Sequence, residues 1–503
     1  MRDFVQNFPL FSIILCLLSS SGSTLLKGKA AKWLNTVVIC ICGAMSLILM
    51  VYCGINGSFT YSMGHVPAPW GNEVRGGVLE GGMGFFFCLI MLLSMMGGRK
   101  KVLEEVEDTK YNLYYILVNL MLCSLLALVY TNDLFTAYVF VEINTISACG
   151  LIMIRQIGRT FVAALRYMIM SQLGSGLFLV GICMIYDLTG HLLMSNIKES
   201  VAELIATGQY REPLLVAIAF LIVGLSIKSA LFPFHAWLPD AYGYSTISSA
   251  AILSSLVSKG YIFLVIKIIY RVIGFEVLRD SYLLNVLFAF SLCAIVFGSV
   301  SAIRTIDIRR MIAYSSIAQI GYIYLGIGLG TKAGMIAAVF QILAHAATKS
   351  MLFISAIGMT DASNTSRKIR DLTGAAYRNR VAGAGFMAGA LSMVGIPLFS
   401  GFISKLLFME ASVNNSQGKM IAALIVLAIS TVLNAIYFMR VIIRIYSPEH
   451  DLYKDRMGFC VIKFRMQKEY TVAIAVFILL NILLGLYSDS VLKIIEKGID
   501  MFA

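Results

Sequence analysis

The sequence contains few charged residues and few prolines. Charged residues make up 13% of the 503 positions and prolines number eight, whereas hydrophobic residues make up 59% and the mean hydropathy is +0.84. The shortage of charge excludes a soluble globular protein of this length, whose surface would need a larger polar fraction. The sequence therefore predicts an all-α polytopic membrane protein with many apolar segments of spanning length.

Sequence motifs for cofactors are also missing. The ten cysteines are scattered, with no CxxC pair and no metal-ligand spacing. There is no glycine-rich phosphate loop, no haem-attachment motif and no iron–sulfur spacing. We therefore expect no cofactor and no metal in this chain, and we expect any iron–sulfur clusters in partner subunits.

The positive charges are concentrated between the apolar segments. A formal net charge of +13 could by itself suggest a nucleic-acid partner. However, about 24 Lys and Arg fall on one set of short loops and about ten on the other, which is the pattern that sets membrane topology. The asymmetry predicts a multi-pass protein of the cell's inner (plasma) membrane, with both termini outside the cytoplasm and no nucleic-acid partner. The richer set comprises residues 27–32, 99–110, 155–159, 304–310, 367–380 and 440–468.

About fourteen segments reach the roughly 20 apolar residues that a spanning helix needs. We expect the first to be a retained helix, because Asp3 offsets Arg2 and no Ala-x-Ala cleavage site follows. The segments are 8–26, 34–54, 81–98, 111–131, 134–154, 160–186, 213–232, 246–270, 282–303, 311–330, 334–358, 381–403 with an extension to about 412, 419–446 and 470–490.

Two loops are long. The outer loop 55–80 is rich in Gly and Pro, which suits a small hairpin or a partner contact. The inner loop 447–469 is basic, which suits topology determination and contact with anionic lipid, or else docking of a partner protein.

Two of the segments are expected to be discontinuous helices. Pro233 and Pro239 interrupt the seventh segment and Pro397 the twelfth, and each interruption has an intramembrane lysine beside it, Lys228 and Lys405. The two interrupted segments lie five positions apart in the series, as two inverted five-helix repeats would require. The predicted division is 1–107 (helices 1–3, with the outer loop 55–80), 108–280 (first repeat, helices 4–8), 281–447 (second repeat, helices 9–13) and 448–503 (basic inner loop and helix 14).

A small set of ionisable residues lies within the apolar segments. An intramembrane Lys costs about 2.5–3.5 kcal/mol, so such residues are by default functional. Each has a structural explanation: His345 alone would more often be a hydrogen-bonded core residue, Glu142 could neutralise one lysine, and Lys267, near a segment end, is expected to snorkel. A shared hydrated seam would lower the free-energy cost of burying all of these residues at once. The set is Glu142, Lys228, Lys259, His345, Lys349 and Lys405.

These residue types suit proton transfer. Burial disfavours the lysine ammonium and a nearby carboxylate restores it, so moving Glu142 relative to Lys228 would change the proton affinity of the lysine. Histidine can accept a proton on one ring nitrogen and release one from the other. His345 and Lys349 lie four apart, hence on one helical face.

Four sequence stretches resemble one family. The run KSALFPFHAWLPDAY at 228–242, followed by 248–259, resembles the signature region of the antiporter-like subunits of respiratory complex I and of the Mrp cation/proton antiporters. AYSSIAQIGY at 313–322, HAATKSMLF at 345–353 and GIPLFSGFISK at 395–405 resemble further motifs of that family in the same order. The resemblance implies fourteen helices, inverted five-helix repeats and discontinuous helices 7 and 12.

The resemblance also implies roles for the buried residues. Glu142 and Lys228 resemble the paired glutamate and lysine, Lys259, His345 and Lys349 the central relay, and Lys405 the terminal lysine. The outer-loop run GHVPAPWGNEV at 64–74 is similar to that of the D-type subunit of Mrp antiporters and of related subunits of membrane-bound hydrogenases.

The sequence thus predicts a proton-translocating subunit of a multisubunit membrane complex, of Mrp Na+/H+ antiporter type. Its expected partners are other membrane subunits, protons, Na+ and lipid. One alternative is the proton-pumping subunit of a membrane-bound hydrogenase or a complex I-like dehydrogenase. An alternative of another class is a stand-alone carrier of an organic solute, which uptake assays with the single chain would reveal.

Overall fold

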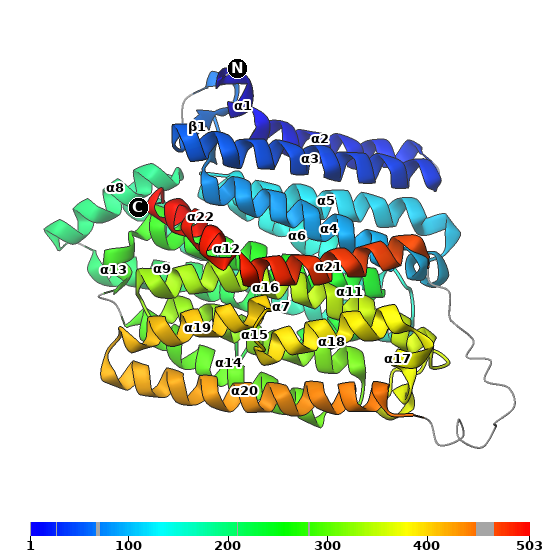
Figure 1. Cartoon of the computed structure of the whole chain (residues 1–503). Helices are drawn as coiled ribbons and strands as arrows, with labels where there is room; N and C mark the ends of the chain where they lie inside the picture. Colours follow the sequence, from blue (N-terminus) through cyan, green and yellow to red (C-terminus); the bar gives the residue numbers. More distant parts are fainter. Residues whose placement is uncertain are drawn as a thin grey trace, which may run out of the picture.

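The chain folds as a bundle of roughly parallel helices (Figure 1). A computed structural model describes residues 2–26, 28–66, 71–208, 210–279, 282–448 and 467–502. Within these ranges, twelve uninterrupted helices are long and apolar enough to cross a membrane. The prediction of an all-α polytopic membrane protein is therefore confirmed. The two segments predicted to be discontinuous are not among the twelve. Helix Arg211–Lys228 carries three charged residues at its ends, and the twelfth segment is split into helices of 15 and 14 residues.

The helices within residues 2–56 lie at one edge of the bundle, together with a β-hairpin. Strands β1 (Phe59–Ser62) and β2 (Glu73–Gly76) pair antiparallel. A hairpin in loop 55–80 is thus confirmed, although residues 67–70 lie outside the described residues. The helices of this part are α1 (Arg2–Gln6), α2 (Phe8–Leu25), α3 (Lys29–Asn56), η1 (Met63–His65) and α4 (Val78–Glu105).

The next part contains the first break. Helix α9 ends at Lys228 itself, and α10 begins only at Leu238. Ser229, Ala230 and Leu231 are at most 1% exposed, as non-helical backbone at membrane depth must be. The helices of this part are η2 (Asp108–Lys110), α5 (Tyr111–Tyr130), α6 (Leu134–Met153), α7 (Gly158–Thr189), α8 (Met194–Thr207), α9 (Arg211–Lys228), α10 (Leu238–Tyr244), α11 (Ile247–Ile252), η3 (Leu253–Val257), α12 (Ser258–Ile268), η4 (Ile269–Ile273) and α13 (Phe275–Arg279).

The second break lies where Pro397 predicts it. Helix α18 ends at Val394 and α19 begins at Ser400. Helix α22 follows the last spanning helix and was not predicted. The helices of this part are α14 (Leu283–Arg304), α15 (Ile308–Gly328), α16 (Lys332–Asp361), η5 (Ile369–Leu372), α17 (Ala375–Arg378), α18 (Arg380–Val394), α19 (Ser400–Val413), α20 (Gln417–Tyr446), α21 (Lys468–Leu486) and α22 (Ser488–Asp500).

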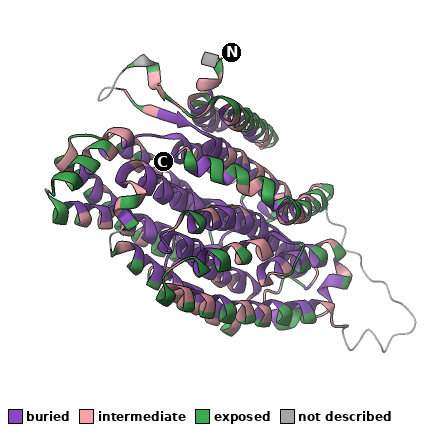
Figure 2. Ribbon diagram, turned by 60° about the vertical axis from the view of Figure 1, so that its left-hand side comes forward, coloured by how far each residue is buried: buried purple, intermediate pink, exposed green. Residues whose placement is uncertain are grey.

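Burial increases toward the middle of the bundle (Figure 2). Every residue in the most apolar stretch of 247–273 is buried, and 89% are buried in that of α16, against 33% in α20. The two central segments carry Lys259, His345 and Lys349, so these charges are enclosed by protein rather than lipid. The predicted repeats and the four-part division stay predictions. Most of the basic loop 447–469 lies outside the described residues.

The second break leaves no room for a side chain at Gly401. A Cβ there would lie 1.8 Å from the carbonyl oxygen of Ser392, whereas one at Gly418 would meet nothing within 4 Å. We expect Gly401→Ala to lower the stability of the protein by about 1–3 kcal/mol, because overpacking forces the backbone apart. Gly418→Ala is the matched control. Thermal unfolding of the detergent-solubilised protein measures both, and equal melting temperatures would contradict the close contact.

Candidate functional site

Lys228 and Glu142 meet beside the first break. Lys228 Nζ on α9 lies 3.8 Å from Glu142 Oε1 on α6 and donates a hydrogen bond of 2.6 Å to Thr145 Oγ1, one turn further along α6. It also lies 5.6 Å from the centre of the Tyr261 ring on α12. The Lys228 side chain is fully buried and that of Glu142 is 21% exposed. The predicted pair therefore exists, with the carboxylate on its more accessible side.

Uncharged residues complete this cluster, and they were not among the predicted site residues. Gln172 Nε2 on α7 donates to Glu142 Oε2 at 3.2 Å. The Tyr261 hydroxyl donates to Asn144 Oδ1 at 3.1 Å, and Asn144 Nδ2 donates to Ser124 Oγ at 2.8 Å. These contacts hold α5, α6, α7 and α12 around the pair. Only the i, i+3 spacing of Glu142 and Thr145 could have suggested a shared face from sequence.

Thr145 accepts the hydrogen bond from Lys228, which gives it a positioning role. We expect Thr145→Val to slow proton translocation about tenfold, the effect of losing one hydrogen bond to a charged group. Thr145→Ser keeps the hydroxyl and should restore most of the rate. Both variants should assemble, and equal rates in the two would contradict this role. Proton uptake into vesicles containing the assembled complex measures the rate.

Lys259 lies in the middle of the bundle and is 0% exposed. Its Nζ donates to the backbone carbonyl of Ser254, inside the π-helical turn η3 that immediately precedes α12. Such widened turns free backbone groups and are frequent at functional sites. Because Tyr261 lies on the same helix, α12 connects the Glu142–Lys228 pair to the centre of the bundle.

His345 and Lys349 lie on α16, and both are buried. Lys349 Nζ donates to the carbonyl of Ile312 at 3.0 Å and to Ser315 Oγ, both on α15. Within the described residues, neither ring nitrogen of His345 has a hydrogen-bond partner in the protein. Helix α16 packs against η3 and α12, so His345 and Lys349 lie on a helix next to the one that carries Lys259. Positive charges that share a low-dielectric interior repel one another.

A small cavity joins His345 to Lys405. It has a volume of about 10 Å³, enough for about one water molecule, and both side chains line it. Gln341 Nε2 donates to Gln319 Oε1, and Ser404 Oγ donates to Gln341 Oε1, each at 2.5 Å, along its wall. The polar side chains among the lining residues would give a water the partners that it needs, and a water here would bring the unpaired His345 ring into a hydrogen-bonded chain.

Lys405 is tied to the second break. Its Nζ donates to the carbonyl of Val394, the last residue of α18, at 2.6 Å and to Thr431 Oγ1 at 3.0 Å. Each of these two lysines therefore lies at a break in a helix. Lys405 contacts the last residue of α18, and Lys228 is itself the last residue of α9.

The prediction that Lys267 snorkels is wrong. Its side chain is 0% exposed, and Nζ donates to the carbonyl of Val129 at 2.8 Å and to that of Thr131. These carbonyls end α5, where the last turn of a helix leaves unpaired acceptors. Lys267 therefore caps a neighbouring helix.

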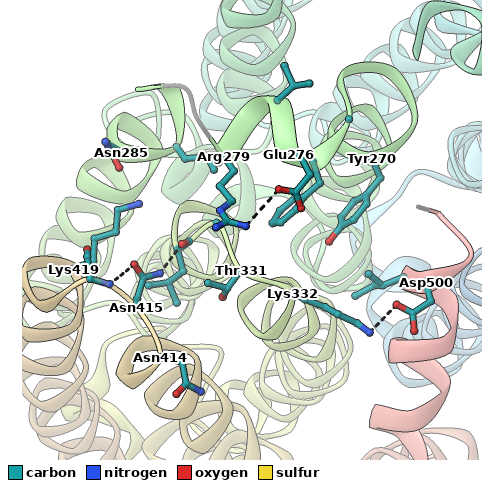
Figure 3. Close-up of a pocket in the computed structure, with 18 of the residues that line it drawn as sticks. Tyr270, Glu276, Arg279, Asn285, Thr331, Lys332, Asn414, Asn415, Lys419 and Asp500 are labelled. Atoms are coloured by element: carbon teal, nitrogen blue, oxygen red, sulfur yellow. Dashed lines mark hydrogen bonds and ion pairs between the residues drawn. The ribbon is translucent and has the colours of Figure 1, made fainter. Parts of the chain in front are cut away.

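A wide cavity of about 970 Å³ opens at one end of the bundle, between α13, the α15–α16 turn, the α19–α20 turn and α22 (Figure 3). Two ion pairs lie in it: Lys332 lies 2.7 Å from Asp500, and Arg279 lies 3.4 Å from Glu276. None of the six predicted site residues is among its lining residues.

No metal site accompanies the buried lysines in the described part of the chain, where no group of three or more His, Cys, Asp or Glu side chains could hold a metal ion. The expected absence of cofactors stays a prediction.

The fold and this series of buried ionisable residues define a membrane protein of the antiporter-like class. Residues 131–431 match the family described as NADH:quinone oxidoreductase/Mrp antiporter, transmembrane, and the chain belongs to that family. It is 34% identical over 385 residues to NADH-quinone oxidoreductase subunit N of Desulforudis audaxviator, covering 76% of this chain and 74% of that one.

Two further comparisons concern antiporters. The chain is 25% identical over 451 residues to the D-type subunit of the Na(+)/H(+) antiporter of Alkalihalophilus pseudofirmus, covering 89% and 87% of the two chains. Its fold is similar to that of a chain in the Mrp complex from Dietzia sp., with a TM-score of 0.86, 21% identity and coverage of 99% and 97%. The predicted family resemblance is confirmed.

Proposed function

We propose that this chain is the proton-translocating subunit of a multisubunit Mrp-type Na+/H+ antiporter, corresponding to the D-type subunit of such complexes. One observation carries the proposal: Glu142 forms an ion pair with the fully buried Lys228 at the first helix break. The similarity over most of both chains to the D-type subunit of an antiporter supports the type of complex.

The proton path that we propose follows the buried groups in order. Glu142, the more accessible member of its pair, exchanges protons with Lys228. The central relay is Lys259, His345 and Lys349, in which mutual repulsion favours a single proton that moves from one group to the next. The cavity beside His345 leads to Lys405, where protons leave near the second break.

The pair at the first break provides a coupling point. Its 3.8 Å separation is an ion pair without a direct short hydrogen bond, because Lys228 Nζ instead donates to Thr145. A shift of α6 toward α9 would stabilise the ammonium, and a shift away would favour release of its proton. Binding of Na+ in a neighbouring protein of the complex could drive such a shift, in keeping with an antiporter.

We place the chain in the inner membrane with both termini outside the cytoplasm, on the distribution of Lys and Arg between the loops. Its partners are other membrane subunits, together with protons, Na+ and lipid; nucleic acid is not among them. In vesicles with the cytoplasmic face inside, protease added to the outside should remove a tag fused at the C-terminal end of the chain. Protection of the tag would contradict this orientation.

A second candidate function differs in the reaction that drives proton translocation. The 34% identity to a subunit of an NADH-quinone oxidoreductase favours a redox-driven complex, a membrane-bound hydrogenase or a complex I-like dehydrogenase, in which partner proteins hold iron–sulfur clusters. In both candidates this chain moves the protons, so the surrounding subunits distinguish them.

Iron content separates the two candidates. We expect the complex that co-purifies with this chain in mild detergent to be colourless and free of iron, because Na+/H+ exchange requires no redox centre. Iron analysis and the visible spectrum of the complex measure this. Broad absorbance of iron–sulfur clusters, in proportion to the chain, would contradict the antiporter and support the redox-driven complex.

A further inference from the structure

A basic groove lies at the end of α20, away from the proton path. It has a volume of about 860 Å³ and lies between the last turns of α20 and residues 306 and 368–370. Basic and apolar side chains line the groove together, and α20 contributes both kinds. The basic residues are Lys368, Arg370, Arg440 and Arg444, and the apolar residues include Ile306, Ile436, Met439 and Ile443.

The charge pattern of α20 fixes the depth of the groove. Residues 420–439 contain no Asp, Glu, Lys or Arg. Those 20 residues span about 30 Å as a helix, which is the thickness of the hydrocarbon core. Arg440 therefore lies at the boundary of the hydrocarbon, and Arg444, one turn further, lies at the level of the lipid headgroups.

The groove has a large excess of positive charge. All four basic residues are exposed. Among the described residues, Asp371 is the one carboxylate in ion-pair contact with them, at 3.1 Å from Arg370 Nε. The nearby carboxylate of Asp307 accepts instead from the backbone N–H groups that begin α15. An anion in this groove would therefore meet cations that nearby carboxylates neutralise only in part.

Backbone contacts hold the basic residues of the groove in place. Asp307 and Lys368 form an antiparallel β-bridge, and the N–H of Ile369 donates to the carbonyl of Ile306 at 2.9 Å. Arg440 donates to the carbonyls of Ile303 and Thr305, both at 2.8 Å. The shape of the groove is therefore set by backbone contacts and does not depend on flexible side chains alone.

The apolar lining of the groove continues along the outer face of α20. Ile425, Ile429 and Val432 are exposed on this helix, followed by Ile436 and Ile443 in the groove itself. An acyl chain could lie along this face over its whole length, whereas a soluble anion would use the cationic end alone. The combination of a long apolar face and basic groups at headgroup depth is typical of lipid recognition.

We propose that this groove binds an anionic phospholipid. Its phosphate lies between Lys368 and Arg444, and an acyl chain runs along Ile443 and Ile436 toward the membrane centre. Arginine suits this role because its guanidinium can donate two parallel hydrogen bonds to a phosphate. The site is independent of the proposed function, since none of the six proton-path residues lines it.

Native mass spectrometry of the intact complex, extracted in mild detergent and reconstituted with phosphatidylglycerol or phosphatidylcholine, tests the site. We expect the wild-type complex to retain phosphatidylglycerol through detergent exchange. Lys368→Gln/Arg444→Gln should retain it about thirtyfold less, the loss expected for two cations at an anionic surface. Arg440 stays unchanged because both of its terminal nitrogens donate to backbone carbonyls, whereas Arg444 donates to the backbone through Nε alone, to the carbonyl of Arg370 at 3.3 Å.

The matched control is Arg211→Gln/Lys493→Gln, which removes two exposed cations outside the groove. We expect it to retain phosphatidylglycerol like the wild type. Equal retention by both double variants would overturn the proposal, as would equal retention of phosphatidylcholine. Displacement of the lipid by excess inorganic phosphate would show a phosphate site without lipid specificity and would overturn it too. A groove covered by a partner protein, with no lipid retained by the wild type, would have the same consequence.

Discussion

Replacing Lys228 by Gln should abolish proton translocation by the assembled complex. Glutamine can still donate a hydrogen bond to Thr145 but cannot carry a proton, so packing at the end of α9 is preserved while the exchange with Glu142 is lost. A positioned proton-transferring group contributes on the order of 10²–10⁴-fold, and we expect a loss of at least about 100-fold. Proton uptake into vesicles containing the complex measures it.

Lys267→Gln is the matched control. Lys267 is as deeply buried as Lys228 and also ends its side chain in hydrogen bonds, but it caps α5 and is not on the proposed path. We expect this variant to assemble and to translocate protons at close to the wild-type rate. Wild-type translocation by Lys228→Gln in an assembled complex would refute the role of Lys228. We expect Glu142→Gln to abolish proton translocation as well, because it removes the carboxylate that exchanges protons with Lys228.

Lys405→Gln should produce a loss of similar size at the other end of the path. The amide can still donate to the carbonyl of Val394, so the end of α18 stays capped, but no proton can pass from the cavity beside His345. We again expect a decrease of at least about 100-fold. The measurement is the same uptake assay, with complex assembly checked by gel filtration.

Lys419→Gln is the control for the replacement of a hydrogen-bonded lysine by glutamine. Lys419 also donates to a backbone carbonyl, that of Gly328 at 3.0 Å, but it lies in the first turn of α20 and lines the wide cavity that none of the six residues lines. We expect Lys419→Gln to leave the rate of proton translocation unchanged. Loss in both variants would indicate that the lysine-to-glutamine change acts through folding, and retention in both would place the exit elsewhere.

The breaks in the helices were predictable because their causes are local. Proline lacks an N–H and cannot continue a helix, so Pro233 and Pro397 mark both interruptions directly in the sequence. A lysine inside an apolar segment is equally visible, since its cost within lipid applies wherever its partners lie. For these reasons Lys228 and Lys405 could be placed beside the breaks without a structure.

The partners of these lysines could not be predicted. Thr145, Asn144 and Gln172 are uncharged residues on helices that touch α9 and α12 only through tertiary packing, and no spacing specifies that packing. Lys267 shows the same limit. Its position near a segment end suits snorkelling, but in the folded bundle its ammonium reaches the carbonyls at the end of α5 instead of the membrane surface.

Two helices of more than ten residues were missed because their sequences are mixed. Helix α8 has the sequence MSNIKESVAELIAT and α22 the sequence SDSVLKIIEKGID, both too polar to suggest a spanning segment. Each buries one face and exposes the other, so each is stabilised by neighbours rather than by lipid. A search for spanning segments detects apolar length and therefore passes over such helices.

The widened turn η3 also constrains the length of the chain. A regular helix turns by about 100° per residue, so the extra residue in a π-turn sets the angular relation between the residues before and after it. Deleting one residue within 253–257 would restore a regular helix and rotate Lys259 and Tyr261 together relative to Ser248. Substitutions in this turn can be absorbed by local packing, but insertions and deletions there would disconnect the centre of the bundle from the Glu142–Lys228 pair.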